Sequence, residues 1–420
     1  DPDSPADSGD DAMPPAPAAV PVVSASSDNH GLRILIAEDN DVTRMKLQAD
    51  LEKWGHHVTA AEDGEQAWEY FQKYDFSIVL TDWMMPNVDG LELVKRIRAT
   101  GRATYVYVIM LTAKAEKHDI VLGMGAGADD FLAKPYHRDE LNVRIRAGKR
   151  IVDMTRAIGK TSRRIDRGIQ AAARIQRSFL PEAAPEIPGL QFAWEYQPCD
   201  ELGGDMLNIV NLDENHIGLY ILDVNGTGVP ASLLATNVSR FMASANDNAS
   251  ILVDRQGNPE NPTIVEPERV AWKLNQQFSG NPETNQFFTL VYGILNRDTL
   301  EFCYTCAGHP PLFHQNGSGP PTALEGFGLP IGVMADNDDY HQESIQLQSG
   351  DRLFFYSNGV PNTPNAEDAL FGRERLAASI EKNRETALAG VPPAIVSEIR
   401  EFGDHSELKD DLTILAVEIE

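Results

Sequence analysis

Four short apolar runs in the first third of the chain are each followed by a charged or hydroxyl side chain. The runs, with the side chains that follow them, are 32–37 with Glu38 and Asp39, 77–81 with Asp82, 106–111 with Thr112, and 131–133 with Lys134. Continuous apolar runs that alternate with helical patterns are typical of a parallel sheet buried between helices. Because ligands bind at the carboxyl ends of such strands, we expect these side chains to converge on one crevice.

This first cluster contains the groups needed to accept a phosphoryl group. Three neighbouring carboxylates repel one another, and a hard divalent cation such as Mg²⁺, which prefers oxygen ligands, relieves that repulsion. With the cation in place, Asp82 is the best candidate for a nucleophile that attacks a phosphodonor and becomes an aspartyl-phosphate. Lys134 and a hydroxyl would then bind the new oxygens. The alternative for Glu38 and Asp39, taken alone, is that they cap the N-terminus of a helix.

The stretch from about residue 32 to 149 resembles the receiver domain of two-component response regulators. The motifs that carry the resemblance are Ile-Ala-Glu-Asp-Asn at 36–40, Leu-Thr-Asp-Trp-Met-Met-Pro at 80–86 and Phe-Leu-Ala-Lys-Pro at 131–135. The resemblance implies a doubly wound α/β fold, a cognate sensor histidine kinase as partner and phosphorylation of Asp82. It implies Mg²⁺ held by Asp39, Asp82 and the backbone carbonyl of Met84, with Glu38 assisting. It also implies a switch role for Thr112 and Phe131, with Lys134 beside them.

Residues of about 138–179 are rich in charged residues and helix formers, which predicts a long helix. Apolar residues recur in it every seven positions, at Ile151, Ile158, Ile165, Ala172 and Phe179. This spacing predicts one seam of a coiled coil and hence a homodimer, although the partner seam includes Thr161 and Gly168 and would pair weakly. A helix packed against its own domains is the alternative. If the coiled coil forms, phosphorylation-dependent docking could shift the pairing of its marginal helices.

A second set of carboxylates follows this helix, next to glycines. The segments are 201–205, 222–228, 357–359 and 409–413. Glycine lets the backbone approach a metal ion or phosphate closely, and apolar runs such as 217–222 supply rigid strands. Carboxylates at strand ends can hold two divalent ions that lower the pKa of water and support an in-line displacement.

From about residue 173 to the C-terminus the chain resembles the metal-dependent protein phosphatases of the PP2C type, in the bacterial branch that acts in sigma-factor partner switching. The motifs are at 173–181, 203–205, 223–226, 307–311, 328–332 and 410–413. The resemblance implies two Mn²⁺ or Mg²⁺ ions bridged by Asp223. Asp205 and the carbonyl of Val224 would complete the coordination of one ion, and Asn358 with Asp411 would complete that of the other.

Asn358 departs from the family pattern, which has aspartate at this position. An amide offers one oxygen but no charge, so we expect weaker metal binding there. One hypothesis is an active Ser/Thr phosphatase acting on a phosphorylated anti-sigma-factor antagonist. The alternative is a pseudophosphatase that serves as a binding or adaptor protein. The retained Asp205, Asp223 and Asp411 favour the active enzyme, and a regulator that only drains phosphate from a kinase fits poorly, since it needs no second site.

The composition limits the partners and the cellular compartment that we expect for this chain. The formal net charge of −27 argues against binding of nucleic acid. No apolar run approaches the length of a membrane helix. The chain has 3 cysteines, too few for a disulfide framework, which favours the cytoplasm. Cys303 and Cys306 resemble a metal or redox pair, but a spacing of three in a strand directs their side chains to opposite faces, so we expect buried cysteines.

The expected fold is therefore an α/β doubly wound receiver joined by a helical linker to an α+β PP2C-type β-sandwich flanked by helices. The expected divisions are a disordered tail at 1–30, a receiver at 31–149, a helical linker at 150–180 and a phosphatase domain at 181–420. The tail is expected because residues 1–30 are mostly Asp, Pro, Ala and Ser without periodicity.

Overall fold

The computed structural model describes residues 31–102, 104–113, 117–243, 250–255, 262–279, 286–317 and 319–420, with side chains for all of these except 117–120. The predicted tail at 1–30 lies outside this range. The described chain divides into two compact units, with the division between Ser162 and Arg163. Within the described residues, no helix combines the length and apolar character that crossing a membrane requires.

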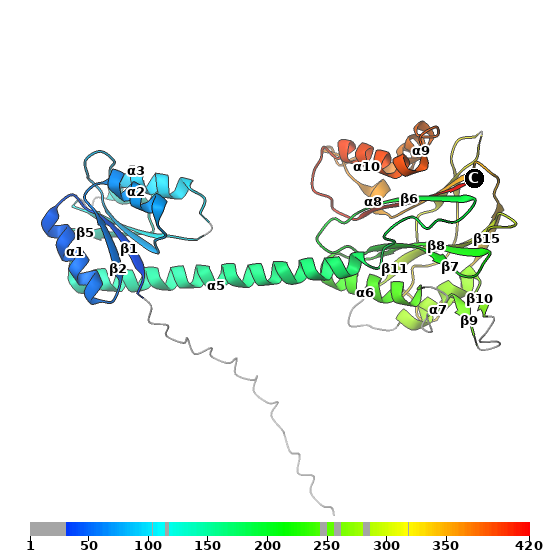
Figure 1. Ribbon diagram of the computed structural model, residues 1–420, viewed down its shortest axis with the longest axis horizontal. Helices are drawn as coiled ribbons and strands as arrows, with labels where there is room; N and C mark the ends of the chain where they lie inside the picture. The colour runs from blue at the N-terminus through cyan, green and yellow to red at the C-terminus, as the bar shows by residue number, and fades with distance from the viewer. Residues whose placement is uncertain are drawn as a thin grey trace, which may run out of the picture. The chain divides into compact units, whose positions relative to one another are not determined.

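The first unit is a parallel sheet between helices (Figure 1). Its strands pair in the order β2-β1-β3-β4-β5. Their bounds are Arg33–Ala37 (β1), His57–Ala61 (β2), Ile78–Asp82 (β3), Tyr107–Thr112 (β4) and Asp130–Ala133 (β5). The helices are Asp41–Lys53 (α1), Gly64–Lys73 (α2), Gly90–Ala99 (α3), Lys117–Ala126 (α4) and Arg138–Arg177 (α5).

Both faces of this sheet are covered, which explains why its strands are continuously apolar. Along β1, Ile34 and Ile36 pack in a core with residues of α1 and α5, whereas Leu35 and Ala37 pack in a second core with residues of α2 and α3. Each core removes apolar surface from water, and two cores require apolar residues at every strand position. The parallel strand order with helices on both faces confirms the predicted doubly wound fold.

Side-chain caps fix where the helices begin. The side chains of Asn40, Asp63 and Asp89 each accept a hydrogen bond from the backbone N–H three residues later, at 3.0, 2.8 and 2.8 Å. These bonds satisfy backbone donors that have no partner inside the helix. Because Asn40 caps α1, the alternative that Glu38 or Asp39 serves as this helix cap is wrong.

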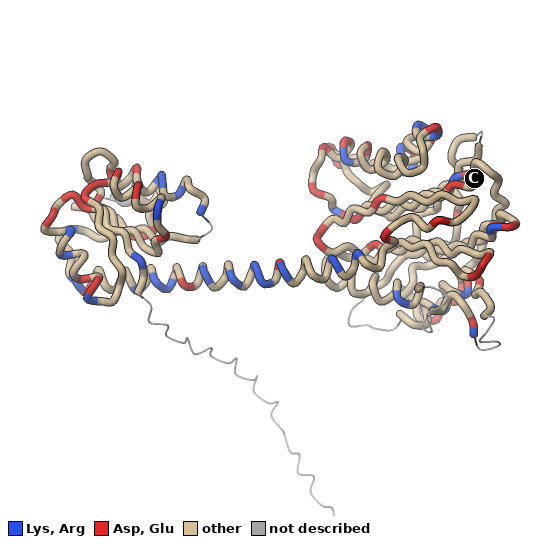
Figure 2. The backbone as a smooth tube through the Cα atoms, viewed as in Figure 1, with Lys and Arg blue, Asp and Glu red and all other residues tan. Residues whose placement is uncertain are grey.

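The predicted linker is the second half of one continuous helix, α5 (Figure 2). Lys and Arg recur along it, and its apolar seam faces solvent. The exposed fractions are 40% for Ile151, 64% for Met154, 67% for Ile158, 56% for Ile165 and 63% for Ile175. Their own units therefore leave these side chains uncovered, whereas Val152 and Phe179 of the same segment pack in the cores of their units. The coiled coil and our domain boundaries stay predictions.

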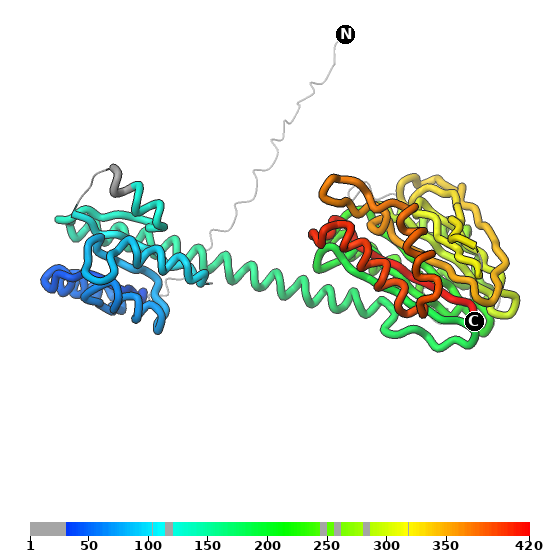
Figure 3. The backbone as a smooth tube through the Cα atoms, turned by 90° about the horizontal axis from the view of Figure 1, so that it is seen from above, coloured from blue at the N-terminus to red at the C-terminus, as the bar shows by residue number. Residues whose placement is uncertain are grey.

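The second unit has a helix–sheet–sheet–helix arrangement (Figures 1 and 3). One sheet has the order β15-β12-β11-β8-β7 and the other β14-β13-β16-β17-β6. The strands of the first sheet are Asp205–Asn211 (β7), His216–Val224 (β8), Phe288–Asn296 (β11), Glu301–Ala307 (β12) and Gln342–Gln346 (β15). Those of the second are Leu190–Gln197 (β6), Leu312–Gln315 (β13), Thr322–Leu324 (β14), Arg352–Tyr356 (β16) and Leu412–Ile419 (β17). A short antiparallel pair joins Val253–Asp254 (β9) to Thr263–Ile264 (β10).

Three apolar layers hold this unit together. Side chains such as Leu219, Val291 and Leu415 fill the space between the two sheets. Helices Gly228–Phe241 (α6) and Pro267–Phe278 (α7) cover the outer face of the first sheet. Helices Gly359–Asn362 (α8), Gly372–Lys382 (α9) and Val391–Phe402 (α10), with the 3₁₀ turn Leu388–Gly390 (η1), cover the second. The predicted β-sandwich flanked by helices is confirmed.

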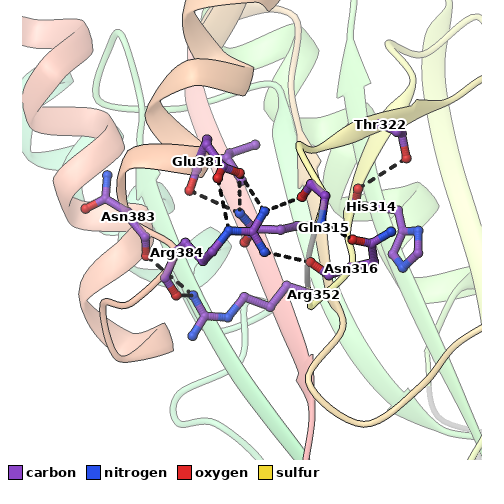
Figure 4. A network of polar contacts seen from close by, with 10 residues as sticks. His314, Gln315, Asn316, Thr322, Arg352, Glu381, Asn383 and Arg384 are labelled. Atoms are coloured by element: carbon purple, nitrogen blue, oxygen red, sulfur yellow. Dashed lines mark hydrogen bonds and ion pairs between the residues drawn. The ribbon is translucent and has the colours of Figure 1, made fainter.

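A buried arginine fastens the chain between α9 and η1 to the second sheet (Figure 4). The guanidinium of Arg352 in β16 lies 2.9 Å from the carboxylate of Glu418 in β17. It also donates to the backbone carbonyls of Arg384 at 2.9 Å and Thr386 at 3.0 Å. Arg384 in turn donates to the carbonyl of Asn316 at 2.7 Å. Because Arg352 satisfies several acceptors at once, its loss leaves all of them unpaired.

We predict that Arg352→Ala lowers the stability of the second sheet by about 3 kcal/mol, the cost expected for breaking a buried ion pair. Faster hydrogen exchange of the β16 and β17 amides would measure it. Lys382→Ala, which removes an ion pair to Glu398 on the surface, is the control and should leave exchange unchanged. Equal exchange in the two variants would contradict the role of Arg352.

Candidate functional site

The predicted receiver residues meet at the carboxyl ends of the strands in the first unit. Glu38 and Asp39 follow β1, and Asp82 ends β3. One carboxylate oxygen from each of the three lies within 4.8 Å of the other two. The ammonium of Lys134, which follows β5, lies 2.7 Å from Glu38 Oε2 and 2.8 Å from Asp82 Oδ2. Segments separated by about a hundred residues of sequence therefore form one acidic cluster with one internal cation.

The electrostatics of this cluster fit a bound cation. Burial raises the pKa of Glu38, and Lys134 offsets that rise only in part. Burial alone would lower the pKa of Lys134, but its hydrogen bonds to Asp82 and Glu38 outweigh this and raise it. Lys134 thus stays cationic, and three carboxylates still face one positive charge. A hard divalent ion such as Mg²⁺ has the charge and the oxygen preference to balance the remainder.

The remaining predicted receiver residues lie around this cluster. Met84 is two residues beyond Asp82, and its side chain is 72% exposed, so only its backbone carbonyl is available to a metal ion. Thr112 is buried at the end of β4, where its carbonyl accepts from the backbone N–H of Lys134 at 2.7 Å. The ring centre of Phe131 lies 6.4 Å from that of Trp83. The switch roles of Thr112 and Phe131 remain predictions.

Phe131 also packs against the backbone of α4. A Cβ atom placed on Gly123 would come within 2.3 Å of the Phe131 ring, so the glycine is what lets the ring lie there. A change in the position of this ring would therefore change its contacts with both Trp83 and α4.

The second acidic cluster lies where the two sheets of the second unit meet. Asp205 opens β7 and is paired across the strands with Asp223, near the end of β8. Asn358 precedes α8, and the Asp410–Asp411 pair precedes β17. The hydroxyl of Thr413 in β17 donates to Asp205 Oδ2 at 2.5 Å and so links the sheets at the cluster.

Glycine brings the predicted carbonyl ligand close to this cluster. A Cβ atom on Gly204 would lie 2.9 Å from the carbonyl oxygen of Val224, which is too close for any other residue without a shift. The backbone N–H of Val224 donates back to Gly204 at 3.3 Å. The Gly203-Gly204-Asp205 motif therefore has a direct steric reason at its second glycine.

Asp411 is not placed as the resemblance led us to expect. One of its oxygens accepts from the backbone N–H of Cys199 at 2.8 Å. The other accepts from the N–H groups of Gly204 at 2.6 Å and Asp205 at 3.1 Å. Both oxygens thus hold the backbone, which gives Asp411 a supporting position, and its role as a metal ligand stays a prediction.

The neighbouring Asp410 is the better candidate. It is partly buried, and its negative charge acts on Asp223. Both aspartates lie near the cluster, because Asp411 accepts from the N–H groups of Gly204 and Asp205, and the charges of Asp410 and Asp411 both act on Asp223. They stand side by side in the sequence, and spacing alone does not tell which one a metal ion would use.

The cluster carries negative charge that the protein does not neutralise. Burial first, and then the charge of Asp410, raise the pKa of Asp223 to about 7. Burial and the charges of Asp223 and Asp411 raise the pKa of Asp205 well above its usual range, although hydroxyls of Ser357 and Thr413 oppose this. Within the described part of the chain, no basic side chain is among the groups that shift either pKa.

Two buried oxygens in this cluster have no hydrogen-bond partner among the described residues, Asp223 Oδ2 and Asn358 Oδ1. A buried polar atom without a partner is costly, and native structures usually satisfy it with protein, water or an ion. The oxygens gathered here belong to carboxylates, an amide and a backbone carbonyl. These are the ligands that hard divalent cations such as Mg²⁺ or Mn²⁺ prefer. The residues therefore fit the metal ions that the resemblance implies.

Comparisons with known proteins match both units. Residues 34–146 match the response regulator receiver domain, and residues 213–420 match the Stage II sporulation protein E (SpoIIE) family. The phosphoserine phosphatase RsbU of Bacillus subtilis is 28% identical over 250 residues, which cover 59% of this chain and 69% of RsbU. The transcriptional regulatory protein CseB of Streptomyces coelicolor is 45% identical over 114 residues, 27% of this chain and 47% of CseB.

Among solved structures, the SiaA-PP2C domain of Pseudomonas aeruginosa aligns with a TM-score of 0.51 at 18% identity. The alignment covers 62% of this chain and 99% of that domain. At this identity the likeness establishes the PP2C fold of the second unit. The match to CseB covers less than half of that regulator, so only its receiver part is shared.

We predict that Asp410→Asn impairs metal binding, whereas Asp411→Asn impairs the backbone structure that Asp411 holds. Asp411→Asn replaces an acceptor oxygen by a donor beside backbone N–H groups, which should destabilise the second unit by about 1–3 kcal/mol. Asp410→Asn removes charge repulsion with Asp223, so stability should hold or rise while Mn²⁺ no longer stabilises the unit. Thermal unfolding with and without Mn²⁺ measures both effects, and the reverse pattern would restore Asp411 as the ligand.

Proposed function

We propose that this chain, which joins a response regulator receiver domain to a SpoIIE-type phosphatase domain of the PP2C fold, is a metal-dependent protein phosphatase controlled by phosphorylation of Asp82. The observation that carries the catalytic part is the pair of partnerless buried oxygens on Asp223 and Asn358, within a cluster of carboxylates that no basic side chain neutralises. Such a cluster gains most from divalent cations.

The residues divide into ligands and supports. Asp223 would bridge two Mn²⁺ or Mg²⁺ ions, with Asp205 and the Val224 carbonyl at one and with Asp410 and Asn358 at the other. When bound, such ions lower the pKa of water and neutralise charge on a phosphoryl group.

Neighbouring residues of the chain hold the proposed ligands in fixed positions. Thr413 fixes the Asp205 carboxylate through the bond at 2.5 Å. Asp411 fixes the backbone of Gly204 and Asp205 through its two bonds to their N–H groups. Placement on strand ends lets these groups bind without reorganising, which is how a protein lowers the cost of reaching a transition state.

We propose phosphoserine or phosphothreonine of a partner protein as the substrate, and specifically a phosphorylated anti-sigma-factor antagonist. The match to RsbU, which is named a phosphoserine phosphatase, supports this class. The setting we propose is cytoplasmic.

Asn358 motivates the second candidate function, a pseudophosphatase that binds a partner without catalysis. An amide supplies one oxygen and no charge, so it attracts a cation less than a carboxylate would. Asn358 nonetheless keeps its Oδ1 buried and unpaired, as a ligand oxygen would be. We therefore favour the active enzyme.

Turnover of an aryl phosphate with Mn²⁺ separates these two functions. We predict measurable turnover that Asp223→Asn reduces to background, because Asp223 is the shared ligand. Asn358→Asp should lower the Mn²⁺ concentration at half-maximal turnover by about tenfold through its added charge. If the unaltered chain is inactive with Mn²⁺, the binding-only function is the correct one, and turnover restored by Asn358→Asp would identify Asn358 as the cause.

In the receiver, we propose Mg²⁺ at Glu38, Asp39, Asp82 and the Met84 carbonyl, and a sensor histidine kinase as phosphodonor. Lys134 already spans Glu38 and Asp82, so it is placed to bind a phosphoryl oxygen on Asp82. Losing its ion pairs in exchange for that bond would alter the surroundings of Thr112 and Phe131.

A buried amide offers the path from α5 to the phosphatase site. In the last turn of α5, Gln176 is 5% exposed. Its Nε2 donates to the Gly203 carbonyl at 2.7 Å, and its Oε1 accepts from the Gly203 N–H at 3.3 Å. Gly203 directly precedes Gly204 and Asp205, whose N–H groups hold Asp411. A shift of α5 would therefore move the backbone that carries Asp205.

We further propose that the exposed apolar seam of α5 pairs two copies of the chain. Isoleucines at Ile151, Ile158 and Ile165 repeat every seven residues and are at least 40% exposed, as a coiled-coil seam is before it pairs. Pairing of these seams would let phosphorylation of the receiver change the position of α5.

We predict that an acyl-phosphate analogue raises phosphatase turnover about fivefold or more, within the usual range of allosteric coupling. Asp82→Asn should abolish this response because it removes the phosphoacceptor. Gln176→Ala should abolish it while leaving Asp82 phosphorylation intact. Gln170→Ala, an exposed glutamine of the same helix, is the control and should respond normally. An unchanged response in Gln176→Ala would exclude this path.

A further inference from the structure

His309 lies between the two sheets of the second unit, just beyond the end of β12. It is 7% exposed, and both ring nitrogens have partners. Nδ1 lies 2.8 Å from Thr289 Oγ1, and Nε2 lies 3.1 Å from the carbonyl oxygen of Tyr356. A carbonyl can only accept, so Nε2 carries the proton and Nδ1 accepts from the Thr289 hydroxyl. Burial lowers the pKa of His309 to about 4, which keeps the ring in this neutral form.

The two partners of His309 belong to different sheets and to different halves of the proposed metal site. Thr289 in β11 is paired across the strands with Asp223 in β8. Tyr356 ends β16, and Asn358 follows it by two residues. The imidazole therefore connects the neighbour of one proposed ligand to the strand that leads to another.

Two further polar links between the sheets lie at a different ligand, Asp205. Thr413 bonds to Asp205, and Asp411 bonds to the N–H groups of Gly204 and Asp205. These bonds fix Asp205 against β17. His309 acts on the side of Asp223 and Asn358, each of which has a buried side-chain oxygen without a hydrogen-bond partner among the described residues.

We propose that His309 is a positioning residue that sets the separation of Asp223 and Asn358, and that the Thr289 hydroxyl is what holds its ring in place. This inference rests on the proposed metal-dependent function. The position of Asn358 is especially important because its side chain brings no charge. An uncharged ligand attracts a cation only through a well-placed oxygen dipole, so affinity at that position depends on geometry.

Three threonine variants test this without removing the buried ring. Thr289→Val keeps the shape of the side chain but removes the donor to Nδ1, whereas Thr289→Ser keeps the donor. Thr305→Val is the matched control, because Thr305 lies in the same sheet and its hydroxyl also donates a hydrogen bond, to the backbone carbonyl of His341 at 2.8 Å. Each variant is made in the full chain with Asp39→Asn, so that the receiver carboxylates do not contribute to Mn²⁺ binding.

Calorimetric titration with Mn²⁺ is the readout, with turnover at saturating Mn²⁺ measured alongside. Thr289→Val should bind Mn²⁺ about three- to tenfold more weakly, the effect of one neutral hydrogen bond. Its turnover at saturating Mn²⁺ should stay close to that of the parent. Thr289→Ser and Thr305→Val should bind as the parent does.

Equal binding by Thr289→Val, or an equal loss in Thr289→Ser or Thr305→Val, would overturn the positioning role. A parent chain that binds no Mn²⁺ would instead contradict the proposed function, and the positioning role with it.

Discussion

Buried negative charge without a protein counter-charge is the constraint on which the second unit depends. Asp205 and Asp223 lie opposite each other on adjacent strands, and Asp410 and Asp411 meet them from the other sheet. Burial strengthens every repulsion among them because water no longer screens it. The fold offsets part of this with Thr413, Ser357 and backbone N–H groups. What remains is a set of oxygens arranged for cations.

The two acidic sites of the chain differ in how the repulsion among their carboxylates is offset. In the receiver, Lys134 lies within hydrogen-bond distance of two carboxylates and balances part of their charge. In the second unit, no basic side chain of the described residues acts on Asp205 or Asp223. The receiver cluster is therefore organised before a metal or phosphoryl group arrives. The second cluster has no such counter-charge, and under the proposed function metal ions would supply it.

The sequence was sufficient for features that follow from local patterns. Apolar runs that end in Asp39, Asp82 and Lys134 predicted convergence because parallel strands present their carboxyl ends at one edge. The composition of 138–179 predicted the helix that became α5. The motifs led to the PP2C sandwich and to Asp205 and Asp223.

Features that depend on side-chain direction or on distant contacts were not accessible. Choosing between Asp410 and Asp411 requires knowing what each carboxylate contacts before β17, and the bonds of Asp411 to backbone N–H groups join residues more than 200 positions apart. The Gln176 contact with Gly203 joins residues 27 positions apart, and no periodicity marks it. The bridging position of His309 appears only once both sheets are placed.

Anomalous scattering from a crystal of the chain grown with Mn²⁺ tests the central claim most directly, because it locates ions without relying on turnover. The account predicts Mn²⁺ peaks beside Asp223, with Asp410 and Asn358 as ligands and Asp411 bound only to backbone N–H groups. A receiver peak at Asp82 with no density beside Asp223 would contradict it.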